Sequence, residues 1–311
     1  MRKTLSLVGA LIAALAIAAP VGAITHGVPD AGEHPYVGEL LFFVPDAPDP
    51  RFDDPGGWFT CSGTLMTSTK VLTAGHCTFG VGLNGASTTD GGAITDAAHG
   101  GVGGNDIWIS FAAEPNFSIL PPSSGFARNQ NPQRYAAWKN ALNASSEWHR
   151  GTATPHPLYD DLAFFVHDAG VVSLGAPVAG ISTMGRLAPS GWLDRYAKQS
   201  TNHVLEAAGY GLELVQGKKE FGGDTRRKSD PVLTSLKSSP PNTYFLMSTN
   251  AATGGTCFGD SGGPLFDNTN SNVVVGVNSF ATSSNCVHAA GGYRVDEPDD
   301  QAFLAGFGIQ P

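Results

Sequence analysis

The chain has 311 residues, enough for one large domain or two small ones, with 40 glycines, 21 prolines and only 14% charged residues. This composition favours a loop-rich, all-β protein over a helical one. Lysines and arginines are sparse and the formal net charge is −9, which excludes the basic footprint of a nucleic-acid-binding protein.

The first 23 residues have the pattern of a secretory signal peptide. Arg2 and Lys3 form its positive region, residues 5–19 its apolar region, and residues 21–23 a small-residue cleavage site. The apolar run is short for a transmembrane helix, which needs about 20 residues. We therefore expect cleavage after Ala23 and a secreted, extracellular protein that begins at Ile24 and has no membrane attachment.

Runs of apolar and β-branched residues predict the strands of the mature chain. In chain order they are residues 37–44, 58–65, 71–73, 107–111, 162–166, 207–211, 273–280 and 292–295. Stretches rich in glycine, proline or charged residues predict exposed loops; they are residues 45–56, 78–106, 115–146 and 218–231. We expect the two longest, 78–106 and 115–146, to decorate the rim of the fold rather than to shape a binding site.

A short helix is predicted at the C-terminal end, within residues 296–308. Pro298 lies near its start, and Phe303, Leu304 and Phe307 share its inner face. The helix would close the fold against the preceding strands.

All four cysteines follow the signal peptide, at positions 61, 77, 257 and 286. They allow three connectivities, of which proximity favours Cys61–Cys77 and Cys257–Cys286. Each disulfide would contribute about 3–4 kcal/mol in the chain-entropy account. His76 beside Cys77 leaves a metal site as the alternative, but no Cys-x-x-Cys pattern supports it. We therefore expect disulfides, no metal and no cofactor.

The stretch from Cys257 to Pro264 reads Cys-Phe-Gly-Asp-Ser-Gly-Gly-Pro. A serine flanked by glycines lets backbone N–H groups approach a reacting carbonyl without a Cβ in the way. Donors aimed at the oxygen that becomes negative are often the largest single term in acyl transfer. The pattern predicts Ser261 as a nucleophile, with an oxyanion hole made by the N–H groups of Gly259 and Ser261. A glycine-rich turn is the alternative if the stretch stood alone.

It does not stand alone, because Thr-Ala-Gly-His-Cys occupies residues 73–77. Together the two motifs resemble the trypsin/chymotrypsin family of serine proteases, in which alanine usually stands where this chain has Gly75. The resemblance is discontinuous over most of residues 24–295. It implies one peptidase domain, residues 24–311, built from two six-stranded antiparallel Greek-key β-barrels and a short C-terminal helix. Barrel one would span about 24–170 and barrel two about 180–295.

The resemblance also implies a catalytic triad in the order His76, Asp161, Ser261. Asp161 opens an Asp-Leu-Ala sequence like the one that carries the family's acid, whereas the neighbouring Asp160 is out of register with it. His76 would take the proton of Ser261, and Asp161 would hold the imidazole in the right tautomer. Ser279 matches the serine that supports the acid. Residues 168–177 would then connect the barrels.

Asp260 is expected to be buried beside the nucleophile, where an unpaired carboxylate is costly. In the family this carboxylate pairs with the amino group of a newly freed N-terminal residue, and Ile24 is placed to be that residue. Because signal removal alone would free Ile24, our hypothesis is that export and activation are one event.

Substrate preference is predicted by counting back from the nucleophile. This places the base of the primary pocket at Gly255, where a preference for lysine or arginine would require an acid. We therefore expect an uncharged P1 residue, apolar or small, P1 being the residue on the acyl side of the cleaved bond. The predicted substrate-binding residues are Gly255, Thr256, Ser279, Phe280 and Ala281.

These inferences predict a secreted, monomeric serine endopeptidase that acts on proteins or peptides. The alternative is a protease-fold protein that binds a partner without cleaving it, although no triad residue has been lost. An esterase is a third option, since the same triad cleaves esters.

Overall fold

A computed structural model of the chain describes residues 24–83, 103–198 and 203–311. The expected signal peptide and most of the glycine-rich insertion at 78–106 lie outside the described residues. Within the described ranges, no helix is both long enough and apolar enough to cross a membrane.

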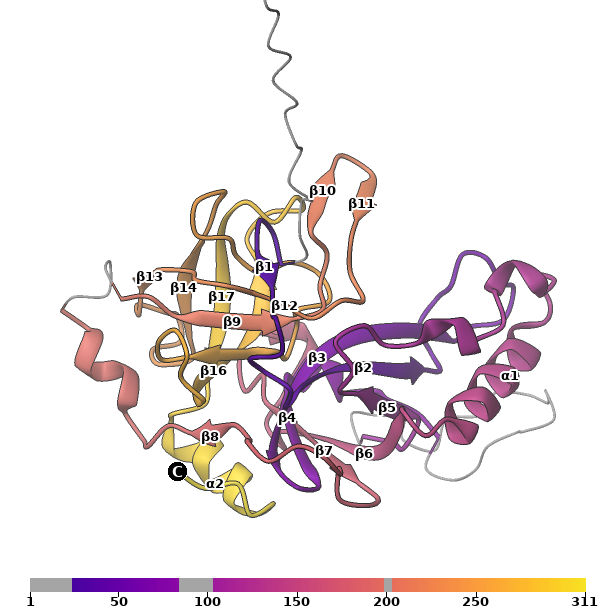
Figure 1. The fold of residues 1–311 in the computed structure, drawn as a ribbon, viewed down its shortest axis with the longest axis horizontal. Helices are drawn as coiled ribbons and strands as arrows, with labels where there is room; N and C mark the ends of the chain where they lie inside the picture. The colour runs from indigo at the N-terminus through magenta and orange to yellow at the C-terminus, as the bar shows by residue number, and fades with distance from the viewer. Residues whose placement is uncertain (1–23, 84–102, 199–202) are drawn as a thin grey trace, which may run out of the picture.

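The first half of the chain forms a closed antiparallel barrel of six strands in the order β2-β3-β4-β7-β6-β5. The strands are β2 (Val37–Val44), β3 (Gly57–Thr67), β4 (Lys70–Thr73), β5 (Ile107–Ser110), β6 (His149–Pro155) and β7 (Gly170–Leu174). The barrel therefore includes β7, so residues 168–177 are not the connection between barrels that the sequence predicted. It is drawn from indigo to magenta in Figure 1.

Strand β2 is buried along nearly its whole length because both of its faces are covered. Leu40 and Phe42 point into the barrel core, whereas Phe43 packs outward against Tyr135. Tyr135 belongs to α1 (Asn131–Ala144), which covers the side of this barrel that faces away from the second sheet (Figure 1). The 115–146 excursion is thus a folded layer on the barrel; it also contains the 3₁₀ turns η2 (Phe117–Ile119) and η3 (Ser123–Gly125).

Strand β1 from the N-terminus and eight strands from the second half form a nine-stranded sheet with the path β1-β12-β9-β15-β16-β17-β14-β13 and β8 paired to β16. In Figure 1 strand β1 is drawn in indigo and the others from salmon to yellow. Its strands are β1 (Val28–Pro29), β8 (Arg186–Leu187), β9 (Glu206–Gly209), β12 (Arg227–Ser229), β13 (Leu233–Ser235), β14 (Tyr244–Thr249), β15 (Pro264–Phe266), β16 (Val273–Ala281) and β17 (His288–Arg294). The all-β class with two barrel-like sheets is confirmed, and the second sheet has nine strands because two-residue strands such as β1 and β8 join it.

The remaining elements lie around this sheet. They are the hairpin of β10 (Leu214–Gln216) and β11 (Lys219–Phe221), the 3₁₀ turn η5 (Trp192–Tyr196) and α2 (Pro298–Ala305). The predicted closing helix is confirmed, since Leu304 is buried and Phe303 and Phe307 pack against the core. The predicted exposed loop at 218–231 was wrong in structure, since it contains two strands: β11 is exposed as expected, whereas the ends of β12 are buried between β9 and β1.

The two barrels are joined by hydrogen bonds that fix the cleft between them. The Tyr210 hydroxyl, at the end of β9, donates to the carbonyl oxygens of Val37 (3.1 Å) and Ala112 (2.7 Å) in the first barrel. The Ser62 N–H on β3 donates to the Ser261 carbonyl oxygen (2.7 Å). The strand that carries one disulfide cysteine is therefore bonded directly to the loop that carries the predicted nucleophile.

Candidate functional site

His76 lies in a 3₁₀ turn, η1 (Gly75–Cys77), directly after β4. Its backbone N–H donates to Asp168 Oδ1 (2.9 Å), and its Nδ1 lies 3.1 and 3.0 Å from the two carboxylate oxygens of Asp168. The Ser279 hydroxyl donates to Asp168 Oδ2 (2.6 Å), and the Asp168 side chain is fully buried. Three hydrogen bonds therefore orient one carboxylate toward one imidazole.

The electrostatics of this pair favour a charged imidazole. Burial disfavours the imidazolium, but the Asp168 carboxylate outweighs it and raises the pKa of His76 above its usual value. In the neutral ring, the contact with Asp168 keeps the proton on Nδ1, so Nε2 carries the free lone pair. The ring is thus set in the tautomer that accepts a proton at Nε2.

The acid predicted from the sequence was wrong, because Asp161 is exposed and belongs to a 3₁₀ turn, η4 (Asp161–Ala163). No strand follows Asp161 at 162–166, so its Asp-Leu-Ala sequence matches the family's pattern but does not begin a strand. The register of β4 with β7, which pairs Thr73 with Gly170, explains why Asp168 takes its place. Residues just before β7 must lie beside residues just after β4, where His76 stands. The signal that the sequence analysis missed is Asp168 itself, an acid two residues before the buried strand that begins at Gly170.

Ser261 lies on a tight turn against the segment that carries His76. Gly262 has φ +75°, and a Cβ there would overlap Thr73 Oγ1 and lie 2.7 Å from the Ala74 nitrogen. The Gly262 N–H donates to the Asn278 carbonyl oxygen (2.8 Å), which holds the turn against β16. Glycine is required at 262 because this turn passes so close to the end of β4.

The two predicted oxyanion donors are open. Among the described residues, neither the Gly259 N–H nor the Ser261 N–H donates a hydrogen bond. Gly259 has φ +97°, a Cβ there would lie 2.8 Å from Gly211 Cα, and its carbonyl oxygen accepts from Ser62 Oγ (2.9 Å). The Gly259 N–H belongs to the preceding peptide, whose Phe258 carbonyl oxygen accepts from the Leu212 N–H (2.8 Å), so that peptide is also held while its N–H is left free for a ligand oxygen.

Asp260, between these donors, is fully buried. Its oxygens accept the backbone N–H groups of Gly211 and Cys257, each at 2.8 Å, but burial dominates and raises its pKa to about 7. No cationic side chain of the described residues forms an ion pair with it. Ile24 is buried as well, but its nitrogen belongs to a peptide bond in the full chain, so the Ile24–Asp260 pair stays a prediction.

The two disulfides predicted from proximity are confirmed. Cys61 bonds to Cys77 with a Cα–Cα distance of 6.3 Å, and Cys257 bonds to Cys286 with a Cα–Cα distance of 5.2 Å. The first disulfide fixes the turn beside His76, and the second closes a loop that contains Ser261 and fixes the start of the nucleophile turn. Because the sulfurs of Cys61 and Cys77 are bonded to each other, they offer no thiolate to a metal.

Among the residues that the structure describes, one other group has metal-ligand chemistry. His156, His167 and Asp299 place their nitrogen and oxygen atoms within 4.8 Å of one another. However, His156 Nδ1 accepts the Leu158 N–H (3.2 Å), so its proton is on Nε2 and neither nitrogen is free. The two imidazole rings are also stacked in nearly parallel planes (8°), so their lone pairs do not converge on one point. These residues do not fit a metal ion.

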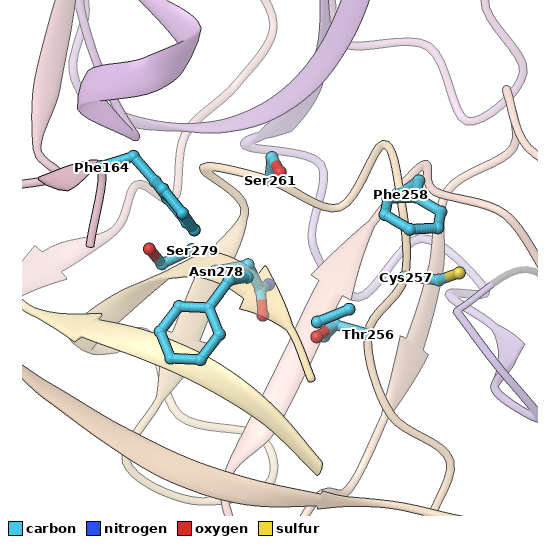
Figure 2. Close-up of a pocket in the computed structure, with 9 residues that line it drawn as sticks. Phe164, Thr256, Cys257, Phe258, Ser261, Asn278 and Ser279 are labelled. Carbon is cyan, nitrogen blue, oxygen red and sulfur yellow. The ribbon is translucent and has the colours of Figure 1, made fainter. Parts of the chain in front are cut away.

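A cavity of about 230 Å³ opens beside Ser261. Its lining is uncharged and consists of Phe164, Thr256, Cys257, Phe258, Ser261, Asn278, Ser279, Phe280 and Ala281 (Figure 2). The structure thus brings together four of the five predicted substrate-binding residues. The fifth, Gly255, does not line the cavity: it packs against Thr249, where a Cβ would overlap the side chain.

Sequence reasoning missed three lining residues, Phe164, Phe258 and Asn278. Phe164 comes from the turn after η4, which had been predicted as a strand, and Phe258 and Asn278 each adjoin a predicted residue. Phe164 and Phe280 have their ring centroids 6.2 Å apart, and Tyr244 lies 5.4 Å from Phe280. Aromatic rings therefore make up part of the cavity wall, and Tyr244 packs against one of them.

Comparisons with known proteins agree with this geometry. A sequence model of the family described as Trypsin matches residues 137–295, about half of the chain. No curated protein matches the chain in sequence.

Solved structures of similar fold include an HL collagenase (TM-score 0.58, 16% identity, covering 93% of this chain and 100% of that chain). An inactivated protease paralogue of the scabies mite gives a TM-score of 0.57 at 15% identity, covering 93% of this chain and 99% of that one. A mutant of human heparin binding protein gives 0.55 at 14% identity, covering 93% and 98%. At these identities the likeness is one of fold alone.

Proposed function

Because this chain belongs to the trypsin family of serine proteases, we propose that it is an exported endopeptidase with the catalytic residues His76, Asp168 and Ser261. The observation that carries the proposal is the fully buried Asp168 carboxylate, which accepts hydrogen bonds from His76 and from Ser279. A buried carboxylate is costly unless it is paired, and here its partners are the groups that acyl transfer needs.

The reaction follows from these positions. Ser261 Oγ attacks the carbonyl carbon of the scissile peptide bond while His76 Nε2 takes the hydroxyl proton. The N–H groups of Gly259 and Ser261 stabilise the negative oxygen of the tetrahedral intermediate. His76 then gives its proton to the leaving amine as the C–N bond breaks, and water hydrolyses the resulting acyl-enzyme by the same steps. Asp168 holds the imidazole and stabilises its charged form throughout.

Three features support the finer parts of the proposal. Two disulfides suit an oxidising compartment outside the cytosol, in agreement with the predicted signal peptide. The uncharged cavity lining supports an uncharged P1 residue. Asp260, buried with only backbone donors, supports activation by a free Ile24 amino group. We expect the protein to act as a monomer on protein or peptide substrates.

A non-catalytic role is the second candidate, because one structure of similar fold is described as an inactivated protease paralogue and another as heparin binding protein. A polyanion is a poor partner here, since the chain has a formal net charge of −9. A non-cleaving protein would also have no need for an oriented His76 or for open oxyanion donors.

The test is labelling of the secreted protein by a fluorophosphonate, followed by intact mass, with Ser261→Ala as the matched control. We expect one adduct on the wild-type chain and none on the variant, because the probe reacts only with an activated serine. A correctly processed, folded chain that takes no adduct would favour the binding role. Labelling with ester turnover but no peptide cleavage would favour an esterase.

A further inference from the structure

His167, which directly precedes Asp168, has its ring stacked on the ring of His156. The two ring centroids lie 4.8 Å apart and the ring planes are nearly parallel (8°). His156 follows β6 and is only 4% exposed, and its backbone N–H donates to the Ala169 carbonyl oxygen (2.8 Å). His156 therefore holds the chain on both sides of the acid: its ring contacts the residue before Asp168, and its backbone contacts the residue after it.

The helix α2, from the second half of the chain, contacts the same pair of rings. Asp299 Oδ2 lies 3.2 Å from His167 Nδ1. The ring of Phe303 meets the ring of His156 edge to face, with centroids 4.9 Å apart. His156 is further fixed because its Nδ1 accepts the Leu158 N–H (3.2 Å). The side chain of His167 thus has a fixed ring on one face and a carboxylate beside its Nδ1.

The backbone explains why these contacts matter for the acid. His167 has φ +53°, a left-handed conformation that residues other than glycine rarely adopt, although histidine does so more often than most. Its carbonyl oxygen accepts the Ala169 N–H (2.8 Å), which closes a tight turn with Asp168 at its centre. A conformation of this kind persists only where its surroundings hold it. The place of the Asp168 carboxylate therefore depends on what holds His167.

We infer that His167 is a positioning residue: its ring, packed on His156 and beside Asp299, holds the turn that presents Asp168 to His76. The inference rests on the proposed function and deepens it, since His167 acts through the acid and does not touch the substrate.

A positioning role differs from a purely structural one in its effect on His76. If His167 served only the stability of the fold, the His76 imidazole would be unchanged in any variant that folds. If His167 places Asp168, its loss should alter the His76 imidazole, because burial lowers the pKa of His76 and the Asp168 carboxylate more than offsets it. A loosened carboxylate would therefore lower the pKa of His76.

The test replaces His167 by asparagine, which suits the left-handed conformation but has no ring. The rate of fluorophosphonate labelling is measured against pH, and its acid limb reports the protonation of the base in the free enzyme. We expect the maximal rate to fall by about tenfold, since small displacements of catalytic groups are costly, and the acid limb to move to lower pH. An acid limb that stays in place or moves to higher pH would overturn the inference.

The direction of that shift is informative because of the charges around His167. The titratable groups beside its ring are His156 and Asp299, and both remain in His167→Asn. Loss of a positive charge at position 167 would by itself raise the pKa of His76 and move the acid limb to higher pH. A move to lower pH therefore reports a displaced Asp168 carboxylate.

His203→Asn is the matched control. The ring of His203 is also stacked on an aromatic ring, that of Tyr196 (centroids 3.7 Å apart), and its Nε2 lies 3.0 Å from Asp267 Oδ1. These partners lie outside the proposed site. Thermal unfolding should show a comparable loss of stability in both asparagine variants, whereas His203→Asn should keep the wild-type labelling rate and acid limb. The same shift in His203→Asn would contradict a specific role of His167.

His156 provides a second test that leaves the turn itself intact. His156→Ala removes the ring on which His167 packs, and we expect a lower maximal rate and an acid limb at lower pH. His156→Phe restores an aromatic ring and should recover most of both effects. Equal losses in the two variants would refute the role of the stacked ring. This pair keeps the inference testable if His167→Asn does not fold.

The wild-type protein separates this inference from the proposed function. Wild-type protein that labels, together with a folded His167→Asn variant that labels with the same rate and acid limb, would overturn the inference alone. Wild-type protein that does not label would overturn both.

Discussion

Asp168 and Asp161 lie in the same loop, and only Asp168 has its carboxylate withdrawn from water and bonded to His76. Asp168→Asn would offer an N–H to Nδ1, which moves the imidazole proton to Nε2 and leaves no base for Ser261. We expect the rate of fluorophosphonate labelling at neutral pH to fall by roughly 10³–10⁴-fold. Asp161→Asn should change it by less than about twofold, since surface substitutions have small effects.

Thermal unfolding of both aspartate variants checks that each is folded under the labelling conditions. A loss of labelling in Asp161→Asn as large as that in Asp168→Asn would contradict the assignment. It would mean that the loop rearranges to bring Asp161 to His76.

Gly75 marks the one departure from the family's usual motif around the histidine. A Cβ at this position would lie 2.7 Å from Tyr159 Cδ2 and 3.2 Å from the Ala169 nitrogen. Since Ala169 follows Asp168, Gly75→Ala should press on the segment that holds the acid. We expect a loss of about 1–3 kcal/mol in the free energy of unfolding, typical of overpacking, together with slower labelling.

Gly125→Ala is the matched control, because a Cβ there meets no heavy atom within 4 Å. Adding Tyr159→Leu to Gly75→Ala should recover part of the loss, since the ring that the new methyl meets would be gone. Urea unfolding and labelling rates measure both effects. A Gly75→Ala variant no less stable than Gly125→Ala would show that the Tyr159 ring moves aside at little cost.

At the scale of elements, the sequence predicted strands best where an apolar run is also a strand buried in the core. Strands β2, β5 and β16 are apolar runs bounded by turn residues, and all three were expected at their places. The loop between β6 and β7 misled the prediction because Phe164 and its neighbours are apolar without being a strand. Phe164 lines a cavity, and only the β4–β7 register, a contact between distant segments, brings Asp168 beside His76.

The helix α1 could not be recognised from apolar periodicity because it is attached largely by buried polar groups. Lys139 and Tyr135 both contact Asp106, which precedes β5, and Arg150 on β6 completes the cluster at 2.7 Å from Asp106 Oδ1. A local pattern cannot show that these residues have partners, because the partners come from other parts of the chain. Because these polar groups are buried together with their partners, residues 115–146 fold onto the barrel although their sequence is polar.

The cluster predicts a stability effect without a catalytic one. Asp106→Asn would leave the buried ammonium of Lys139 without its carboxylate, and we expect a loss of about 3–5 kcal/mol in the free energy of unfolding. Asp53→Asn is the matched control, since Asp53 pairs with Arg128 on the surface and such pairs contribute less than about 1 kcal/mol. Urea denaturation measures both. The labelling rate of folded Asp106→Asn should stay at the wild-type value, and a parallel loss would mean that α1 acts on the site.

At the scale of the whole molecule, the site is complete only where the two barrels meet. The first barrel contributes His76 and Asp168 through the pairing of β4 with β7. The second contributes Ser261, and Ser279 on β16 reaches across to Asp168. The proposed catalytic residues come from both barrels. The order of the turn around Asp260 in the second barrel should therefore also determine whether His76 and Asp168 of the first barrel can act with Ser261.

We therefore expect Asp260 to link chain processing to pH. Its pKa is raised to about 7 by burial while Ile24 remains in a peptide bond. A carboxyl group whose pKa is higher in the folded state than its unfolded value of 3.8 binds more protons when folded between these two pH values. The stability of the unprocessed chain should consequently fall as pH rises from about 4 to about 7.

A free Ile24 amino group beside Asp260 would remove this trend, because an adjacent positive charge favours the carboxylate and lowers its pKa. The test compares a chain that begins at Ile24 with one that begins at Ala23 and is therefore one residue longer. The Ile24 chain should lose the fall in stability between pH 4 and 7 and label at least about tenfold faster, as ordering of the oxyanion donors requires. Its labelling should decline in alkaline solution, above the usual amino-terminal pKa of about 8, as the amine loses its proton. Equal labelling of the two chains would mean that Asp260 finds another partner, and export would then be separate from activation.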